Sequence, residues 1–398
     1  MNSSGNRTVL ISGASIAGPS LAYWLDRYGF EVTVVERASA IRGGGYPIDI
    51  RGTAREVVDR MGLLPRLREA HVDTRAISFV DIEGDPISTM RPETLTGGVE
   101  GFDLEVRRGD LADALYSLVG ERVEFIFDDS IATLDDRGDR VDVVFESGLR
   151  RTFDLVVGAD GLHSRTRGLV FGPEERFHHY LGGAFAGFSL PNDLGLSHEG
   201  VVWSAPGRAA VLYAQEPGDR VYGFLNFRQE VPPYHAFRDP GAQRELVAAT
   251  FPEQSWHVPR LVKAMWEAPD LFFDVISQIH MPAWSRGRVA LAGDAAHATS
   301  FLSGQGSSVA LVGSYILAGE LARHPDHDQA FAAYERKARG FAERNQALAG
   351  HGGTHLAPAT QEELDARNAA LRDPSTLKST ENHEASIALT LPDYGRAE

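Results

Sequence analysis

Short apolar runs, each followed by glycine, mark the first part of this chain. Residues 8–12 (Thr-Val-Leu-Ile-Ser) lead into Gly13, and a helical pattern then begins at Pro19 and ends at Gly29. Residues 31–35 (Glu-Val-Thr-Val-Val) form the next apolar run. Runs of this length are typical of strands buried in a parallel sheet. The pattern therefore predicts a strand–helix–strand unit of about 30 residues.

The remaining patterns predict alternating helices and strands. Helical periodicity occurs near residues 53–70, at 110–118, at 307–322, at 327–349 and at 361–371. Apolar or alternating runs predict strands at 76–82, 122–127, 130–134, 140–146, 153–158 and 289–292. Residues 180–230 are rich in aromatic and β-branched residues with glycine and proline between them, which predicts an antiparallel sheet. The tail from residue 351 is polar, and the helix at 361–371 is the one element predicted there.

The composition argues against a nucleic-acid-binding, membrane-spanning or disulfide-bonded protein. The 55 acidic residues outnumber the 39 basic ones, and the net charge of −16 argues against general affinity for nucleic acid. No stretch holds the roughly 18 consecutive apolar residues that span a bilayer, and the N-terminus lacks a signal-peptide pattern. The absence of cysteine excludes disulfides and thiolate metal ligands. We therefore expect a cytoplasmic protein with no nucleic-acid partner, no membrane span and no metal site.

A glycine turn follows the first predicted strand, where a dinucleotide-binding fingerprint belongs. Gly13 permits the tight turn, Gly18 lets the helix pack on the strand, and Ser15 replaces the middle glycine with another small residue. Glu36 ends the second strand about 20 residues on, where an acid accepts hydrogen bonds from a ribose. Arg37 is a candidate for a phosphate contact, with a solvated side chain as the alternative. Together these features indicate dinucleotide binding rather than a structural turn.

Two later segments repeat the arrangement of a buried strand that ends in glycine and aspartate. Residues 154–167 contain Gly-Ala-Asp160-Gly, and residues 286–297 contain Ala-Gly-Asp294-Ala-Ala-His. Glycine after a strand lets the backbone approach a ligand, and the aspartate can accept from a sugar hydroxyl. Residues 304–306 (Gly-Gln-Gly) then precede a long helix whose exposed N–H groups favour negative charge.

These three segments resemble, in their order along the chain, the signature of group A flavoprotein monooxygenases. This is the para-hydroxybenzoate hydroxylase-like family, which includes tetracycline-inactivating and polyketide-tailoring enzymes. The resemblance covers about residues 1–350. It implies an α/β fold with a Rossmann-like FAD-binding domain (GR2-type), an interleaved antiparallel-sheet substrate domain and a C-terminal helix. The expected boundaries are 1–72, 99–176 and 276–325 for the FAD-binding domain, 73–98 and 177–275 for the substrate-binding domain, and 326–398 for the C-terminal helical segment and tail.

The resemblance also implies roles for individual residues. The first turn would hold the FAD pyrophosphate, Glu36 the adenosine ribose, and Asp294 the ribityl chain. Arg108 would brace the FAD, with Arg107 as the alternative, and either could instead form a surface ion pair. The cofactor-binding candidates are Gly13, Ser15, Gly18, Glu36, Arg37, Arg42, Arg108, Asp160, Asp294, Gly304, Gln305 and Gly306. His297 is expected to be a packing residue rather than a base, and no catalytic side chain is assigned.

The sequence departs from the family pattern at three places after His297. Ser300-Phe301 stand where a proline is usual, Ser307-Ser308 stand where an asparagine is usual, and Gly313-Ser314 stand where Asp-Ala is usual. In the family these positions line or support the flavin ring.

The implied reaction uses FAD, NADPH or NADH as reductant, and O2 as co-substrate. A flavin C4a-hydroperoxide would insert one oxygen atom into an aromatic or polyketide-like small molecule, as in antibiotic biosynthesis and other secondary metabolism. The chain would act as a monomer or weak homodimer. Alternation along a strand places Tyr222, Phe224 and Asn226 on one face, and with Tyr213 they are substrate-binding candidates or, equally, core residues.

Other functions remain as alternatives. The same fold could support epoxidation, Baeyer–Villiger insertion or non-redox ligand binding. A nicotinamide dehydrogenase would use only the first turn and leave the motifs at Asp160 and Asp294 unexplained. A flavin halogenase would carry a Trp-x-Trp-x-Ile-Pro stretch, which the five tryptophans do not form.

Overall fold

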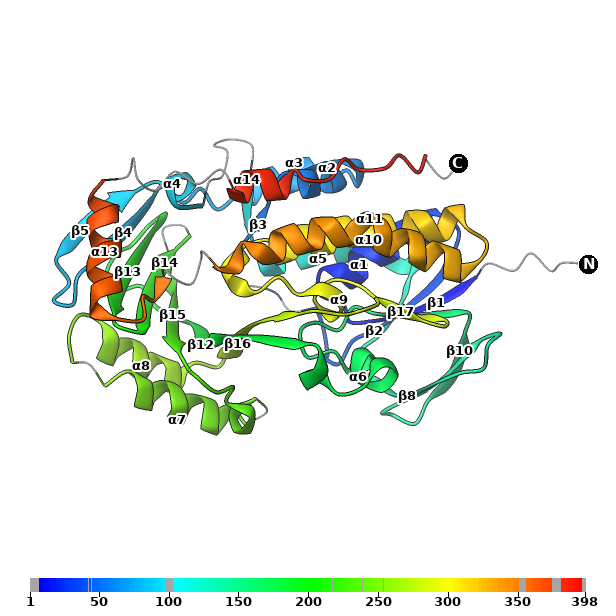
Figure 1. The fold of residues 1–398 in the computed structure, drawn as a ribbon, viewed down its shortest axis with the longest axis horizontal. Coiled ribbons are helices and arrows are strands. Elements are labelled where there is room, and N and C mark those ends of the chain that lie inside the picture. The colour runs from blue at the N-terminus through cyan, green and yellow to red at the C-terminus, as the bar shows by residue number, and fades with distance from the viewer. Residues whose placement is uncertain are drawn as a thin grey trace, which may run out of the picture.

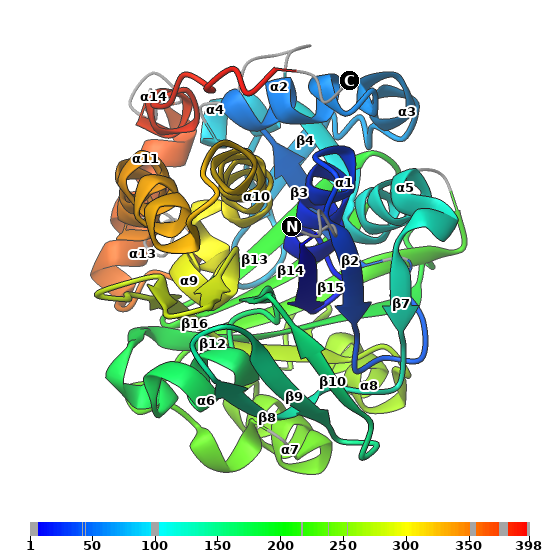
Figure 2. The same ribbon diagram turned by 90° about the vertical axis from the view of Figure 1, so that its right-hand side faces the viewer.

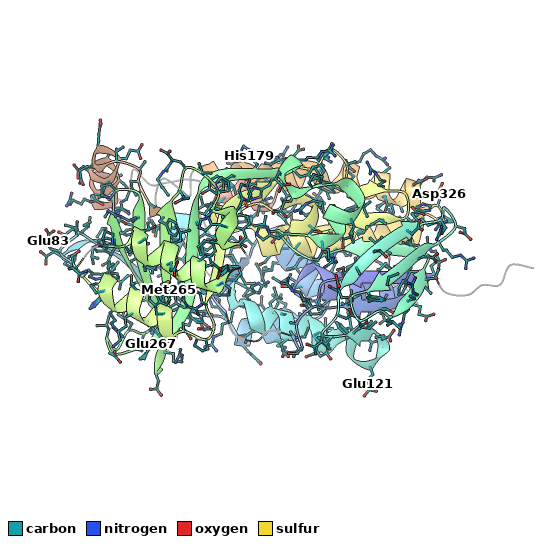
Figure 3. The ribbon with its side chains drawn as sticks, turned by 90° about the horizontal axis from the view of Figure 1, so that it is seen from below. Glu83, Glu121, His179, Met265, Glu267 and Asp326 are labelled. Atoms are coloured by element: carbon teal, nitrogen blue, oxygen red, sulfur yellow. The ribbon has the colours of Figure 1, made fainter. Side chains whose placement is uncertain are left out.

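Two β-sheets lie side by side along the long axis of the molecule in a computed structural model (Figure 1). The structure describes residues 7–41, 43, 45–96, 103–215, 218–237, 239–252, 254–350, 356–373 and 381–395. Figure 3 shows the length of the molecule from below, with Glu83 at the end that carries the larger sheet and Asp326 at the opposite end.

The first sheet has six strands in the order β17-β18-β11-β1-β2-β7. All neighbours are parallel except β17 and β18. Its strands are β1 (Thr8–Ser12), β2 (Glu31–Val35), β7 (Glu124–Ile126), β11 (Leu155–Gly158), β17 (Ser285–Arg286) and β18 (Val289–Leu291). The predicted strand–helix–strand unit is therefore confirmed, with α1 (Ala17–Arg27) as its helix.

Both faces of this sheet are buried, which is why its strands read as continuous apolar runs. Val9 and Ile11 of β1 belong to the core beneath the helices, whereas Leu10 belongs to a second core with Val141 and Phe145. That second core lies under a three-stranded sheet of β8 (Ile131–Asp136), β9 (Val141–Phe145) and β10 (Arg150–Phe153). Figure 2 shows this sheet on the side of β1 and β2 opposite to α1 and α10.

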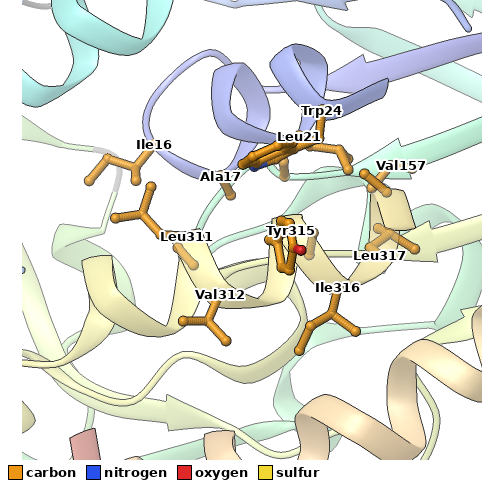
Figure 4. Packing of buried hydrophobic residues seen from close by; sticks show 14 of the residues in the cluster. Ile16, Ala17, Leu21, Trp24, Val157, Leu311, Val312, Tyr315, Ile316 and Leu317 are labelled. Atoms are coloured by element: carbon orange, nitrogen blue, oxygen red, sulfur yellow. The ribbon is translucent and has the colours of Figure 1, made fainter. Parts of the chain in front are cut away.

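The helical layer is built around α10 (Gly306–Arg323), which packs between α1 and α11 (His327–Ala347). Figure 4 shows Leu21 and Trp24 of α1 against Leu311 and Tyr315 of α10. The rings of Trp24 and Tyr315 meet edge to face with centroids 4.9 Å apart. Because α10 is covered on both sides, most of its residues are buried, and most of the buried ones are apolar. The helix α5 (Arg108–Val119) completes the layer beside α1.

The second sheet has seven strands in the order β16-β12-β15-β14-β13-β4-β5. Its strands are β4 (Ala76–Val80), β5 (Pro86–Met90), β12 (His178–Pro191), β13 (Glu199–Ala205), β14 (Arg208–Ala214), β15 (Arg220–Arg228) and β16 (Phe272–Ile279). The antiparallel sheet expected over 180–230 is confirmed. Strand β16 runs through the boundary expected between residues 275 and 276. Helices α7 (Pro240–Thr250) and α8 (Val258–Glu267), which the pattern did not predict, cover one face (Figure 1).

Smaller elements connect these layers. A two-stranded sheet of β3 (Pro47–Ile50) and β6 (Leu104–Arg107) lies near the junction of the two large sheets. The short helices are α2 (Thr53–Arg60), α3 (Leu64–Glu69), α4 (Pro92–Thr96), α6 (Arg165–Phe171) and α9 (Asp294–His297), with 3-10 turns at Gly120–Arg122, Glu174–Arg176, Tyr234–Ala236 and Phe301–Ser303.

The C-terminal segment covers both halves of the molecule. Helix α13 (Gln361–Arg372) lies against β5 and β13, and α14 (Glu381–Ser386) lies against α11. The prediction of a single helix in this tail was wrong, because α14 is too short to give a periodic signal and depends on tertiary contacts. One such contact is the hydrogen bond of 3.2 Å from Asn345 Nδ2 to the Ala385 carbonyl.

Candidate functional site

Three segments that are far apart in the sequence meet at one edge of the six-stranded sheet. Strands β18, β11, β1 and β2 are adjacent and parallel, so their carboxyl ends lie together. The residues just beyond these ends include Asp294, Asp160, Gly13 and Glu36. Ligands of open α/β sheets bind at this kind of edge.

The first turn is a close backbone crossing that only glycine allows. Gly13 has φ +106°, and a Cβ added there would lie 3.0 Å from Asp160 Cα and closer still to the Ala159 carbonyl oxygen. A Cβ at Gly18 would overlap the carbonyl oxygen of Gly13. Glu36 Oε2 accepts a hydrogen bond of 2.8 Å from the Ala14 N–H. The glycines and the acid predicted from the sequence therefore lie in one turn.

Arg108 reaches this turn and Arg107 does not. Arg108 Nη2 donates to Ser15 Oγ at 2.7 Å, whereas Arg107 Nε donates to Gln215 Oε1 at 2.5 Å, at the end of β14. Arg107 is the last residue of β6 and Arg108 is the first residue of α5, so the chain changes direction between them and their side chains reach different neighbours. Arg37 is exposed to solvent, and Arg42 lies outside the described residues.

Asp294 lies at the start of α9, beside the same turn. A Cβ at Gly293 would lie 2.8 Å from Ala17 Cβ, so the third segment packs directly on the first. The Asp294 side chain is exposed, yet burial by surrounding protein raises its pKa, against the lowering effect of Arg108. The carboxylate therefore lies within the electrostatic influence of the Arg108 guanidinium.

Asp160 has a different environment. Its Oδ2 accepts hydrogen bonds of 2.9 Å from both the N–H and the hydroxyl of Thr166, and its Oδ1 accepts from Ser164. Both carboxylate oxygens are thus used at the start of α6. The neighbouring Arg167 is fully buried and donates to the Ala295 carbonyl at 3.1 Å, which ties the second motif to the third. Sequence reasoning assigned Arg167 no role.

The residues before α10 form a compact turn next to Asp294. Gly304 has φ +64° and ends the 3-10 turn, and an ideal Cβ at Gly306 would lie 3.9 Å from Asp294 Oδ1. Gln305 is fully buried, and neither atom of its amide has a hydrogen-bond partner within the part of the chain that the structure describes. A buried amide left unpaired is costly, so this position suits a polar ligand edge.

The departures from the family pattern have structural uses in this chain. Ser308 Oγ accepts from the Arg51 N–H at 3.2 Å and so holds β3 against α10. Ser314 Oγ donates to the Ala17 carbonyl at 3.0 Å and joins α10 to α1. An ideal Cβ at Gly313 would lie 3.5 Å from His297 Nε2, an ordinary van der Waals distance, so this position packs directly against that ring.

His297 is enclosed by aromatic side chains. Its ring lies 4.6 Å from the Trp284 ring, and the Tyr334 hydroxyl lies 3.4 Å from its Nε2. Burial lowers the pKa of His297 to about 4, so the ring is neutral at pH 7.

An aromatic face of the seven-stranded sheet adjoins this edge. Tyr213 and Tyr222 are cross-strand partners, and Tyr213 and Phe224 share a small core with Tyr46 and Tyr222 packed against it. Tyr222 Oη accepts from the Gly45 N–H at 3.1 Å. Asn226 lies in the same alternation, buried, with its amide unpaired among the described residues.

Four further rings belong to this face, and the sequence pointed to none of them as a substrate-binding candidate. The ring centroid of Tyr46 lies 6.1–6.4 Å from the ring centroids of Phe224, Phe272 and Phe301. Phe185 stacks on Phe301 with ring centroids 4.5 Å apart. These residues come from five separate segments, so no local pattern could have grouped them. Phe301 stands in one of the departures noted above, directly before the turn at Gly304.

A charged network joins the two sheets near the site. His163 Nδ1 lies 2.7 Å from Glu174 Oε1, and its Nε2 lies 3.1 Å from Asp274 Oδ1 on β16. Burial alone would lower the pKa of His163, but the hydrogen bonds to Asp274 and Glu174 outweigh it and raise the pKa to about 9. The imidazolium therefore links the Asp160 segment to the second sheet at neutral pH.

A Rossmann-like sheet with a glycine turn, an acid after β2 and an adjoining aromatic sheet define a dinucleotide-binding enzyme of the para-hydroxybenzoate hydroxylase-like fold. A family model described as an FAD binding domain matches residues 273–349. A flavin-dependent monooxygenase from an unknown prokaryotic organism is 36% identical over 391 residues, which cover 98% of this chain and 99% of the relative. The chain therefore belongs to the family of FAD-dependent monooxygenases.

Other relatives agree with this assignment. An uncharacterized protein of Mycobacterium tuberculosis (strain ATCC 25618 / H37Rv) is 45% identical over 361 residues, or 90% of this chain and 97% of the relative. The crystal structure of tetracycline destructase Tet(55) has a TM-score of 0.84 at 34% identity, and the match covers 98% of this chain and 99% of that one.

Neither a membrane span nor a metal site is present among the described residues. Among the residues that the structure describes, no helix combines the length and the apolar character needed to cross a bilayer. Within those same ranges, no three His, Asp or Glu side chains are grouped so that they could hold a metal ion.

Proposed function

We propose that this FAD-dependent monooxygenase uses NADPH or NADH and O2 to insert one oxygen atom into an aromatic or polyketide-like small molecule. The observation that carries the proposal is the meeting of the first turn, Arg108 and Asp294 at one sheet edge, beside a face of aromatic rings. The residues that would bind the cofactor and those that would bind the substrate therefore lie next to each other.

The residues at the edge fit FAD. The crossing of Gly13 and Gly18 leaves no room for a Cβ, and such turns bring backbone N–H groups close to a pyrophosphate. Glu36 lies in the turn where a ribose would be bound, and Arg108 and Asp294 lie on the path to the ring. The unpaired amide of Gln305 would meet a polar edge of the flavin.

Bound FAD would supply the redox and oxygen chemistry after reduction by the nicotinamide cofactor. The part of this chain is to bind, orient and exclude water. The first turn of α10 presents free N–H groups that would stabilise negative charge near Gly306. His297 is neutral and enclosed by Trp284 and Tyr334, so we assign it no proton transfer.

The aromatic face supports a planar, multi-ring substrate. Tyr46, Phe185, Phe224, Phe272 and Phe301 offer both ring faces and ring edges for stacking. The relatives named as tetracycline destructases support including fused-ring polyketides among the candidates. The amide of Asn226 would then hydrogen-bond to a polar group of the substrate.

The test is an absorbance spectrum of the FAD-loaded protein, followed by NAD(P)H titration in the presence of phenols, tetracyclines and other polyketides. We expect a yellow protein, substrate-stimulated oxygen consumption, and one atom of 18O from labelled O2 in the product. Asp294→Ala should weaken FAD binding about ten- to hundredfold, since a hydrogen bond to a charged group contributes about 1.5–3 kcal/mol.

The matched control is Asp139→Ala, which removes an exposed aspartate far from the sheet edge and should leave FAD binding unchanged. A protein that takes up no FAD, or that oxidises NAD(P)H equally well without O2, would overturn the proposed function.

A further inference from the structure

One residue in the turn before α10 has a backbone conformation that is rare for any residue other than glycine. Ser300 has φ +79° and ψ +147°. A non-glycine residue stays in this region only where the surrounding structure holds it there, and such strain often occurs at functional sites. The same turn carries Phe301 and Gln305, so the groups that hold Ser300 also determine where these two side chains lie.

Two buried glutamines hold the two carbonyl groups that precede Ser300. Gln346, near the end of α11, donates from Nε2 to the Ala298 carbonyl at 3.1 Å. Gln278, on β16, donates from Nε2 to the Thr299 carbonyl at 3.2 Å. Both peptide groups before Ser300 are therefore fixed by amides from distant parts of the chain.

The two glutamines, which we call the glutamine clamp, also join their own elements. Gln278 Nε2 donates to the Gln346 carbonyl at 2.6 Å, and Gln346 Nε2 donates to the Ile279 carbonyl at 2.9 Å. Gln278 Oε1 accepts from His280 Nε2 at 2.9 Å. Because both glutamine side chains are buried, water does not compete for these bonds. The clamp therefore ties β16, α11 and the turn into one network.

The peptide group after Ser300 is held within the turn itself. The Ser303 N–H donates to the Ser300 carbonyl at 3.2 Å, and Ser303 Oγ lies 2.9 Å from the same oxygen. Ser303 Oγ also accepts from the Gln305 N–H at 3.1 Å. Ser300 is thus fixed on both sides, and its position is linked through Ser303 to the buried Gln305.

Ser300 also sets the direction of the Phe301 ring. Phe301 is 37% exposed, and its ring stacks on Phe185 with centroids 4.5 Å apart. A return of Ser300 to a negative φ would turn the next residue away from Phe185, because φ rotates one part of the chain against the other. The clamp therefore acts on the aromatic face through Phe301 and on the cofactor side through Gln305.

We propose that Gln278 and Gln346 are positioning residues, which hold Ser300 in its strained conformation and so place Phe301 toward the substrate and Gln305 toward the cofactor. The inference rests on the proposed function, which assigns this turn to the flavin, and it adds two residues that belong to neither binding surface. Without the clamp, the turn relaxes to a negative φ at Ser300 and both side chains move.

The first test needs no cofactor. Ser300→Gly removes the strain and Ser300→Ala keeps it, while both variants lose the same hydroxyl group. With the clamp intact, the Ser300→Gly variant should have the higher melting temperature. With Gln346→Leu added to each, this order should disappear or reverse, because a relaxed turn contains no strain for glycine to relieve. Gln278→Leu gives the same comparison should Gln346→Leu fail to fold.

No difference between the glycine and alanine variants with the clamp intact would overturn the proposal. The same order of melting temperatures with and without the clamp would also overturn it.

The second test uses the FAD-loaded protein. Gln278→Leu and Gln346→Leu should each weaken FAD binding at least about tenfold and shift the visible absorption bands of the flavin, since a displaced turn misplaces the groups around the cofactor. Adding Ser300→Gly to either variant should recover most of the lost affinity, because glycine reaches the native conformation of the turn without strain.

The matched control is Gln243→Leu on α7, which removes a glutamine amide that also donates to a backbone carbonyl, that of Ala236 at 2.9 Å. This change should leave FAD binding and the flavin bands unaltered. Clamp variants with wild-type FAD affinity and spectrum would mean a merely structural role and would sink the proposal. A wild-type protein that takes up no FAD would count against the proposed function instead, and the melting curves would still decide the role of the clamp.

Discussion

At the scale of single residues, the turn after β1 can close only because residue 18 is a glycine and has no Cβ. Gly18 has ordinary helical geometry, but a Cβ there would overlap the Gly13 carbonyl oxygen. Gly340 lies in the middle of α11 with open space around it. The two glycines therefore separate the packing effect of a methyl group from its effect on helix propensity.

Gly18→Ala is expected to destabilise the protein by about 2 kcal/mol or more and to weaken FAD binding, since the overlap outweighs the gain in helix propensity of about 1 kcal/mol. Gly340→Ala, as control, should stabilise by up to about 1 kcal/mol. Thermal unfolding and FAD titration measure both. A stabilised Gly18→Ala variant that binds FAD normally would contradict the packing assigned to this turn.

At the scale of elements, one histidine joins the segment after β11 to strand β16. His163 contacts Glu174 and Asp274, and the rings of His178 and Phe237 lie 6.5 Å and 5.2 Å from it. Its pKa is raised to about 9 in the folded protein. A raised pKa stabilises the fold fully below the unfolded value of about 6.5, and the effect is lost as the pH rises through about 9.

His163→Gln should therefore lower the free energy of unfolding by about 1 kcal/mol at pH 6, a figure reduced for the partial exposure of the ring. The difference from wild type should shrink as the pH increases from about 6.5 to about 9. His179→Gln, at the exposed position labelled in Figure 3, is the control. Melting curves of the wild type and both variants across this pH range measure the stability difference. A difference between His163→Gln and wild type that does not change with pH would contradict the ion pairs of His163.

Sequence patterns predicted most elements but not the contacts between them. The strands around Gly13, Asp160 and Asp294 were recognisable because a parallel strand buried on both faces is apolar throughout. That the ends of these strands lie together became clear only from the order of the strands in the sheet. Helices α7 and α8 were not predicted although they carry local signals: Asp239 caps α7 directly before Pro240, and the buried residues of α8 recur at helical spacing. The rings of Tyr46 and Phe272 were missed because their partners lie on distant parts of the chain.

At the scale of the whole molecule, the C-terminal segment fastens the helical layer. Thr53 Oγ1 donates to the Leu389 carbonyl at 2.6 Å, and Arg60 Nη1 donates to the Pro392 carbonyl at 2.9 Å. Tyr394 Oη donates to the buried carboxylate of Glu320 at 2.5 Å. The segment therefore contacts α2 and α10 at once.

Deletion of residues 381–398 should cost about 3 kcal/mol or more, since it exposes the surface under Leu391, which is 6% exposed, and removes these hydrogen bonds. The control is Ile387→Ala, because that side chain is 49% exposed and should change stability by less than about 0.5 kcal/mol. Denaturant unfolding measures both, and a deletion as stable as the full chain would show that the segment does not stabilise the fold.

The sequence by itself determined the strands before Gly13, Asp160 and Asp294, the glycine turn and the acid at Glu36, because each of these depends on residues that are near one another along the chain. The order of the three motifs then indicated the fold family. The tertiary structure alone decided that Arg108 rather than Arg107 reaches Ser15, that Asp160 is bound by α6, and that Gln278 and Gln346 hold the carbonyls before Ser300. Those outcomes depend on strand pairing and side-chain direction between distant segments. Local periodicity carries no information about such pairings, since many partners would satisfy the same apolar pattern.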